Sequence, residues 1–489
     1  MTELSRNDYN REFCEAVLAR AKAAGAEYAD IRIVSLDEEA ILLRTGNVEQ
    51  LLRESSYGFG VRVIAEGAWG FASAPRLTPE EGRRVAEEAV RIARASASAK
   101  RAEARIAPVD VFEGTFAADF QTDPFEVPLE EKIAALKEAD AAARANDKVK
   151  LTDCMMDFWR TDQVFASTEG AYIEQSKIES GAGITATAIE GSEVQRRSYP
   201  CPFGGDYAVA GYEFVESLKL IEHVDEIARE AVELLSAPTC PAGERALILE
   251  GSMLALQLHE SCGHPIELDR VFGTEASLAG TSFLTPEKLG NYRYGSELVN
   301  ITADATLPGG LGSFAFDDEG VPGQRVDIVN KGIFGGYLTS RETAAEMGWT
   351  SGGAMRADSW NRIPLIRMTN INLLPGDWSF DEMIADTPDG IYAAAPTCWS
   401  IDDKRLNFQF GTEIAWEIKD GSLGRMFKNP IYFGMTPEFW GGCDAICGKD
   451  DWRLWGIPSC GKGEPMQMMH VGHGVAPARF SKVRMEGTE

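Results

Sequence analysis

The chain of 489 residues has no long hydrophobic run, and no stretch approaches the roughly 18 consecutive apolar residues that a membrane-spanning helix needs. Its start, MTELSRNDYNREFCEAVLARAKAAG, carries acidic side chains and no apolar segment of the kind found in secretory signals. We therefore expect no membrane segment, no export signal and a cytoplasmic location.

Positive charge is scarce. The chain has 48 Lys and Arg against 76 Asp and Glu, which gives a net charge of -28. Such a surface repels phosphate backbones and anionic lipids, so the composition argues against a nucleic-acid-binding or membrane-surface protein. Hydrophobic and charged contents of 44% and 25% are typical of a globular protein, and the length favours two domains.

The chain also lacks a disulfide framework. Its nine cysteines are odd in number and scattered without regular spacing. In a reducing compartment we expect most of them to be buried thiols, with one or two available as metal ligands.

Histidine is the scarcest of the metal-binding residues, with five in the whole chain, yet two of them lie close together. His259 and His264 form the pattern H-E-x-x-x-H, with Glu260 directly after the first histidine. Neutral imidazoles bind divalent transition metals, and a neighbouring carboxylate can take a proton from metal-bound water. The pattern is one residue longer than the helical H-E-x-x-H of many zinc peptidases.

The extra residue has a geometric consequence. On a regular helix, residues five apart are rotated by about 140° from each other, so both imidazoles would not face one ion. Gly263 loosens the backbone, and Pro265 disfavours helical geometry at His264. We therefore predict that Ser252 is the helix N-cap, that residues 253–262 are helical, and that His264 lies on an unwound or π-like last turn.

Two histidines leave a catalytic zinc site one protein ligand short, because such sites usually have three protein ligands and a water. An alternative is that the two histidines simply form hydrogen bonds at a helix end. Cys262 falls on the same helix face as two leucines, which favours a buried thiol. The residues alone leave these candidates for the missing ligand: Cys262, Glu267, Asp269, Cys443, Cys447, Cys460, His470 and His473.

The order of predicted elements indicates an α+β fold. Residues 1–237 are expected to form an N-terminal domain in which a helix–strands–helix unit occurs twice, and Ala237–Gly243 marks the boundary. Residues 244–489 are expected to form a β-rich domain that carries the metal-site helix. The predicted helices of the first domain span 8–24, 78–96, 129–145 and 214–235. The predicted strands span 30–34, 40–43, 48–52, 57–71, 149–159, 163–167, 171–179 and 183–189.

A β-rich domain with a free strand edge can hold an extended peptide through main-chain hydrogen bonds. Residues 363–372 are the candidate strand, and Arg356, Arg362 and Arg367 are candidates for anchoring substrate carboxylates or carbonyls. Salt bridges to surface acids are an alternative role for these arginines.

Five motifs in order resemble the TldD/PmbA family of metallopeptidases. They are HESCGH, FDDEGVPGQ at 316–324, GIFGGYLTSRETAAEMG at 332–348, RADSWNRIPLIRMTN at 356–370, and PSCGKG at 458–463. The resemblance covers most of the chain and is strongest from residue 246 onward. Arg362 departs from the family, whose members often carry histidine there.

The resemblance implies an α+β N-terminal domain, a β-rich C-terminal domain, and a zinc ion in a cavity closed by dimerisation. It implies His259, His264 and Cys460 as zinc ligands and Glu260 as the general base. It further implies hydrolysis of unfolded or short peptides, by a homodimer or by a heterodimer with an inactive sibling. The alternative is a metal-stabilised regulatory subunit that modulates a protein partner without hydrolysis, because the family is also associated with gyrase modulation.

Overall fold

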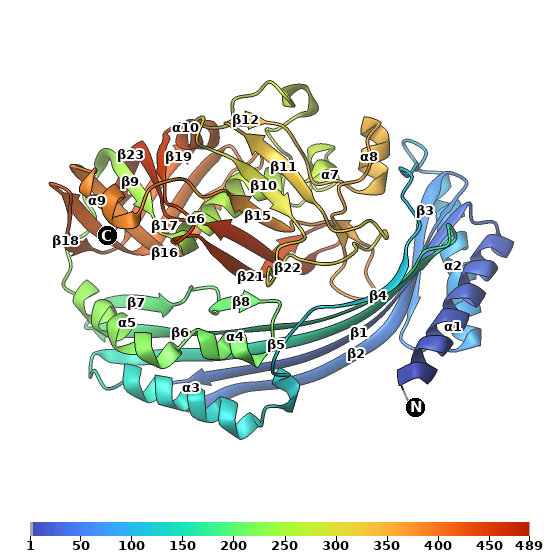
Figure 1. Ribbon diagram of the computed structural model, residues 1–489, viewed down its shortest axis with the longest axis horizontal. Helices are drawn as coiled ribbons and strands as arrows, with labels where there is room; N and C mark the ends of the chain where they lie inside the picture. The colour runs from blue at the N-terminus through green and yellow to red at the C-terminus, as the bar shows by residue number, and fades with distance from the viewer. Residues whose placement is uncertain (1–2, 489) are drawn as a thin grey trace.

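A long, curved, mostly antiparallel sheet organises the N-terminal half of the chain (Figure 1). The structure is a computed structural model that describes residues 3–488. The strand order is β3-β2-β1-β5-β6-β4, and β7 and β8 also pair with β6. The strands are β1 (Tyr28–Arg44), β2 (Asn47–Ala65), β3 (Ala68–Ala74), β4 (Glu113–Ala117), β5 (Val149–Ser167), β6 (Tyr172–Glu190), β7 (Glu193–Tyr199) and β8 (Asp206–Ala208).

The helix–strands–helix order does occur twice. In the first unit α1 and α2 cover one end of the sheet, and in the second α3, α4 and α5 cover the other end (Figure 1). The two units join into one sheet because β1 and β5 pair antiparallel along most of their length. The helices are α1 (Glu3–Ala24), α2 (Pro79–Ala97), α3 (Leu129–Ala143), α4 (Tyr212–Ser217) and α5 (Leu220–Leu234).

The strands are longer than the sequence pattern predicts. The predicted breaks near residues 35–39, 160–162 and 180–182 were wrong, since β1, β5 and β6 run through them without interruption. Half-buried polar residues such as Glu38 and Thr161 interrupt the apolar pattern there, because they line a cavity below the C-terminal half.

One predicted helix begins where the sequence indicates, and another is divided in two. Thr78 caps α2 as expected, since its Oγ1 accepts a hydrogen bond of 3.3 Å from the backbone N–H of Glu81. The predicted helix 214–235 is wrong as a single element: it is divided into α4 and α5 at Lys219, which has a left-handed φ of 51°.

Two sheets and a small hairpin build the C-terminal half. One sheet has seven strands in the order β16-β9-β23-β19-β17-β18, with β20 paired to β23, and the other has six in the order β12-β11-β10-β15-β22-β21. The strands are β9 (Gly243–Leu249), β10 (Ile301–Asp304), β11 (Arg325–Asn330), β12 (Ile333–Phe334), β13 (Met355–Arg356), β14 (Leu365–Ile366), β15 (Asn370–Leu373), β16 (Asp389–Ile401), β17 (Asn407–Lys419), β18 (Ser422–Phe427), β19 (Pro430–Met435), β20 (Cys443–Ile446), β21 (Arg453–Lys462), β22 (Gln467–Val475) and β23 (Ala478–Gly487).

The metal-site helix contacts both of these sheets. It packs on β16 from the larger sheet and on β15, β21 and β22 from the smaller one, and its apolar residues belong to the main core. The helices are α6 (Gly251–Leu258), α7 (Leu268–Val271), α8 (Arg341–Met347), α9 (Phe380–Ala385) and α10 (Thr436–Gly441).

The α+β class and the β-rich C-terminal half are therefore confirmed. In residues 3–488 none of the helices has the length and apolar content that crossing a bilayer requires. Residues 363–372 were the candidate strand for binding a peptide. Their C-terminal part belongs to β15, which has no free edge because it pairs with β10 on one side and with β22 on the other. The domain division at residues 237–244 stays a prediction.

Candidate metal centre

The helix that carries the two histidines is unwound at its C-terminal end, as the sequence predicts. After α6 the chain forms a π turn over His259–Gly263 and then a 3-10 turn over His264–Ile266. A π turn accommodates one more residue than an α turn, so side chains five apart reach the same side. The predicted N-cap was wrong by two positions: the carboxylate of Glu250 caps the helix and accepts a 2.8 Å hydrogen bond from the N–H of Ser252.

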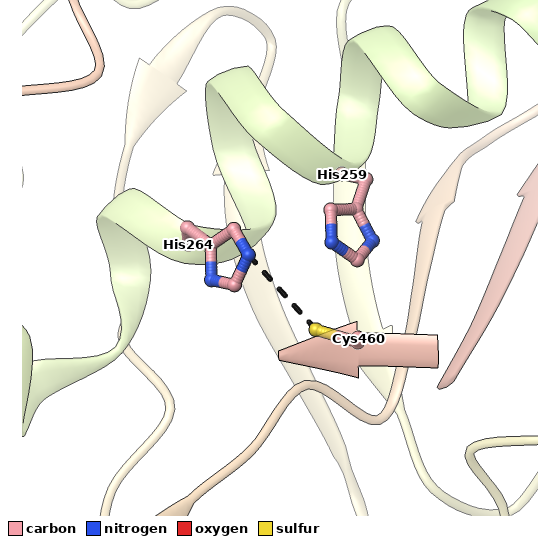
Figure 2. Close-up of side chains that lie close together, drawn as sticks. All are labelled: His259, His264 and Cys460. Atoms are coloured by element: carbon pink, nitrogen blue, oxygen red, sulfur yellow. Dashed lines mark hydrogen bonds between the residues drawn. The ribbon is translucent and has the colours of Figure 1, made fainter. Parts of the chain in front are cut away.

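Three potential metal ligands meet below this turn (Figure 2). His259 and His264 come from the turn, and Cys460 comes from β21, almost two hundred residues later. Their donor atoms all lie within 4.8 Å of one another, and Cys460 Sγ is 3.9 Å from His264 Nε2. All three side chains are buried.

A chain of hydrogen bonds determines which nitrogen of His259 is free. His473 Nδ1 lies 3.3 Å from the carbonyl oxygen of Ile371, which can only accept, so this nitrogen carries the proton. Burial and the neighbouring His259 lower the pKa of His473 well below its usual value, which keeps the ring neutral. Its Nε2 therefore accepts from His259 Nδ1 at 2.8 Å, and the lone pair of His259 Nε2 is left for a metal.

His264 is oriented in the same way by a carboxylate. Its Nδ1 lies 3.0 Å from Glu267 Oε2, so Nε2 keeps its lone pair on the side of Cys460. Two buried cations hold Glu267 in turn: Arg270 Nε at 3.7 Å and Lys462 Nζ at 3.4 Å. A carboxylate behind a ligating histidine is the usual supporting arrangement in metal sites.

The environment of Cys460 favours the thiolate that binds metals. Burial opposes ionisation, but the positive charge of nearby Arg367 acts in the other direction, and the pKa of the Cys460 thiol is lowered. Arg367 is fully buried and donates to two backbone carbonyls, those of Cys460 and Gln467. Burial also lowers the pKa values of His259 and His264, so both imidazoles are neutral near pH 7.

A pocket of about 270 Å³ opens beside the three ligand atoms. Glu260, 6% exposed, lines it and forms an ion pair with Arg405 Nη1. Arg405 Nε is buried and has no hydrogen-bond partner among the described residues. The remaining lining residues are Phe203, Leu256, His259, His264, Trp399, Ile457, Ser459, Cys460 and Gly461.

Arg405 was not identified from the sequence, because it lies 145 residues from Glu260 in an ordinary hairpin turn between β16 and β17. Its backbone has a left-handed φ of 63°, which costs free energy in a residue other than glycine. Asp402 stabilises the turn by accepting hydrogen bonds from the N–H groups of Lys404 at 3.1 Å and Leu406 at 2.8 Å. Arg405 is thus held rigidly against the pocket.

Most other predicted candidates lie elsewhere. His470 contacts Glu179 at 3.1 Å, and Cys262 is a buried thiol whose pKa burial raises to about 12. Cys443 and Cys447 lie in and just after strand β20, not on a helical turn, and neither belongs to a cluster of potential ligands within residues 3–488.

The three predicted substrate arginines do not line the metal pocket. Arg362 is on the surface, 3.7 Å from Asp358, while Arg356 and Arg367 are buried. Their role in binding substrate stays a prediction.

The hydrogen bond from His259 to His473 leads to a prediction with a matched control on the same strand. The substitution His473→Ala should weaken zinc binding by about 10–100-fold, the usual effect of losing such a supporting group. His470→Ala should leave zinc affinity unchanged, because His470 faces Glu179 instead. Competition with a chromophoric chelator measures both affinities, and equal losses in the two variants would contradict the assigned role of His473.

Comparison with known proteins places this chain in a family. The PmbA/TldA metallopeptidase C-terminal domain matches residues 242–487, domain 1 matches 29–93 and the central domain matches 122–237. A metalloprotease of Methanothermobacter thermautotrophicus is 30% identical over 94% of this chain and 96% of its own. A metalloprotease TldD homologue of Haemophilus influenzae is 28% identical, over 94% of this chain and 93% of its own. A zinc metalloprotease TldD homologue of Saccharolobus solfataricus is 29% identical over 43% of this chain and 45% of its own.

Solved structures share the fold. A crystal structure from Thermotoga maritima, described as a candidate modulator of a DNA gyrase, superposes with a TM-score of 0.78 at 19% identity and covers 97% of this chain and 99% of its own. TldE from Thermococcus kodakarensis gives a TM-score of 0.72 at 16% identity and covers 97% of this chain and 100% of its own. Because the family domains together match most of the sequence, the chain belongs to the PmbA/TldD family of metallopeptidases.

Proposed function

We propose that this protein is a zinc-dependent peptidase that hydrolyses unfolded or short peptides. The observation that carries the proposal is the convergence of two oriented imidazoles and a thiol with lowered pKa on one point beside Glu260. The curated relatives are named metalloproteases, and one of them is named a zinc metalloprotease.

The donor set fits zinc. Structural sites usually have four protein ligands, whereas catalytic sites have three and an open position. Across a tetrahedral zinc a sulfur and a nitrogen ligand would lie about 3.5 Å apart, close to the 3.9 Å between Cys460 and His264. The three donor atoms as a set lie within 4.8 Å of one another and would draw closer around the ion. His259, His264 and Cys460 would hold the ion, with the pocket at its open side.

Zinc, when bound, supplies Lewis-acid chemistry: it lowers the pKa of water from 15.7 to about 7 and polarises a carbonyl group. Glu260 acts as the base. Its Oε2 is paired with Arg405, so Oε1 takes the proton from the attacking water and delivers it to the leaving amine nitrogen. Arg405 fixes the carboxylate, and its positive charge beside the pocket would stabilise the negative charge that develops on the substrate carbonyl oxygen.

The strand that carries Cys460 is also suited to bind an extended peptide. β21 is the last strand of its sheet, and its residues Ile457, Ser459, Cys460 and Gly461 line the metal pocket. A free strand edge binds peptide backbone with little regard to side chains. A pocket of about 270 Å³ admits a few residues at a time, which favours short or unfolded substrates. A second copy of the chain, or an inactive family sibling, would close the pocket.

A cleavage assay with and without metal tests the function. Zinc-loaded protein should cut an unfolded protein and short peptides, lose this activity on chelation and regain it when zinc is restored. The native form of the same protein substrate should be cut more slowly than its denatured form. Cleavage that survives complete removal of metal would contradict the proposal.

A further inference from the structure

A second and larger cavity, of about 950 Å³, lies between the N-terminal sheet and the C-terminal half. Its floor is formed by β4, the middle of β1 and β5 and the first half of β6. Its roof includes residues 305–309, 313–316 and 356–358 and the start of β22 (Figure 1). It shares no lining residue with the metal pocket. We call it the interdomain cavity.

Polar groups in this cavity are mostly paired with each other. Burial alone would raise the pKa of Glu179, but Lys177 and His470 contact its carboxylate at 2.7 and 3.1 Å and lower the pKa to about 2. Asp318 accepts hydrogen bonds from Arg32 at 3.0 Å and from Gln163 at 2.8 Å. These charges are already neutralised within the protein.

Arg356 is the exception. It is only 7% exposed, and in the described part of the chain it forms no ion pair with any carboxylate. It donates to the carbonyl of Met368, while its Nε is buried without a hydrogen-bond partner in residues 3–488. Burial and the nearby Arg367 lower its pKa to about 10, against the opposing effect of the Glu179 and Asp318 carboxylates, which are bound to other groups; the guanidinium remains charged near pH 7. A buried cation with an unused donor is costly unless an anion binds it.

The other residues that line the cavity indicate what else the ligand contains besides an anionic group. Phe314 lies 5.5 Å below the Arg356 guanidinium, and Trp159, Phe316 and Met468 add apolar surface. Two carboxylates without a guanidinium or ammonium partner among the described residues, those of Glu38 and Asp119, line it as well. An apolar body with an anionic group for Arg356 and a cationic group for these acids has the charge pattern of a free peptide.

We propose that the interdomain cavity binds short apolar peptides with a free α-carboxylate, which is held by Arg356. The peptide's apolar side chains contact the aromatic wall, and its α-amino group is attracted to Glu38 and Asp119. The cavity would hold such a peptide apart from the metal pocket, because the two share no lining residue. The proposal stands independently of the proposed hydrolysis, because it requires neither zinc nor Glu260.

Isothermal titration calorimetry tests this binding. The protein is used without metal, so that binding of the peptide to zinc does not contribute to the signal. The probes are the dipeptide leucyl-phenylalanine, its C-terminal amide and octanoate. The dipeptide should bind at least about tenfold more tightly than the amide, since the amide cannot form a charge-assisted hydrogen bond with Arg356. Equal affinity of dipeptide and amide, or no binding of the dipeptide, would overturn the proposal. Octanoate binding as tightly as the dipeptide would replace the peptide assignment with a simple apolar acid.

Two variants locate the site. Arg356→Gln should lower dipeptide affinity by about tenfold or more. Since this change also removes the bond to Met368, a second variant, Thr161→Trp, fills the cavity from β5 without altering Arg356. Leu151→Trp is the matched control, because Leu151 lies on the same strand, 46% exposed and outside the cavity. Unchanged affinity in Thr161→Trp, or an equal loss in Leu151→Trp, would place the peptide elsewhere.

Discussion

Replacing Glu260 with glutamine (Glu260→Gln) is expected to lower kcat by about 10²–10⁴-fold, the contribution of a positioned general base, while zinc remains bound. Glutamine keeps the size of the side chain and an oxygen that can face Arg405, but it cannot accept the proton of the attacking water. The measurement is the rate of cleavage of a fluorogenic peptide, together with the zinc content of the same sample.

A second glutamate–arginine pair provides the control. Glu417 on β17 lies 3.2 Å from Arg425 and does not line the metal pocket. Glu417→Gln therefore changes the same chemical group in a similar ion pair and should leave the rate unaltered. If Glu260→Gln retained full cleavage, another residue would be the base. If it lost zinc as well as activity, Glu260 would have a structural role.

Replacing Cys460 with serine (Cys460→Ser) is expected to weaken zinc binding by more than about 100-fold, since loss of a ligand should exceed the loss of a supporting group. A neutral hydroxyl does not replace a thiolate that Arg367 favours. Peptide cleavage should fall in parallel, and excess zinc should restore part of it. Competition with a chromophoric chelator gives the affinity.

Cys398→Ser is the control for this variant, because Cys398 is exposed and free and lies on β16 next to the pocket residue Trp399. It should bind zinc as the unaltered protein does. Unchanged zinc affinity in Cys460→Ser would remove the thiol from the ligand set and leave two histidines without a third protein ligand.

Both variants depend on a site whose parts come from distant segments. The π turn supplies two imidazoles and Glu260, β21 the thiol, β22 the histidine behind His259, and a hairpin turn Arg405. Each candidate ligand has a further group beside it: His473 contacts the His259 ring, Glu267 contacts the His264 ring, and Arg367 donates to the backbone carbonyl of Cys460. Rigid support of this kind lowers the reorganisation required when a metal binds.

The local part of this site could be predicted from the sequence. The spacing of His259 and His264 required a distorted helix end, and Gly263 and Pro265 indicated where it would occur. The structure has a π turn there, although it begins at His259 and so replaces the last four residues of the segment predicted to be regular helix. The N-cap was misplaced because the helix begins at Gly251, before Ser252, and the carboxylate of Glu250 accepts the hydrogen bond from the backbone N–H of Ser252 itself.

The distant part could not be predicted from the residues alone. The sequence left Cys460, His470 and His473 as equal candidates, because nothing local distinguishes a ligand from a histidine that supports a ligand or lies elsewhere. The MMHVGHG motif did carry a signal, since His470 and His473 lie three apart on β22, an odd spacing that places them on opposite faces of the strand. Arg405 carried no signal, because its turn resembles any other hairpin.

The most direct test of the account is zinc K-edge X-ray absorption on the zinc-loaded protein, which identifies the atoms bound to the metal. We expect one sulfur at about 2.3 Å and two imidazole nitrogens at about 2.0–2.1 Å, with the sulfur signal absent in Cys460→Ser. A spectrum of nitrogen and oxygen ligands alone would contradict the site formed by His259, His264 and Cys460, and with it the proposed peptidase.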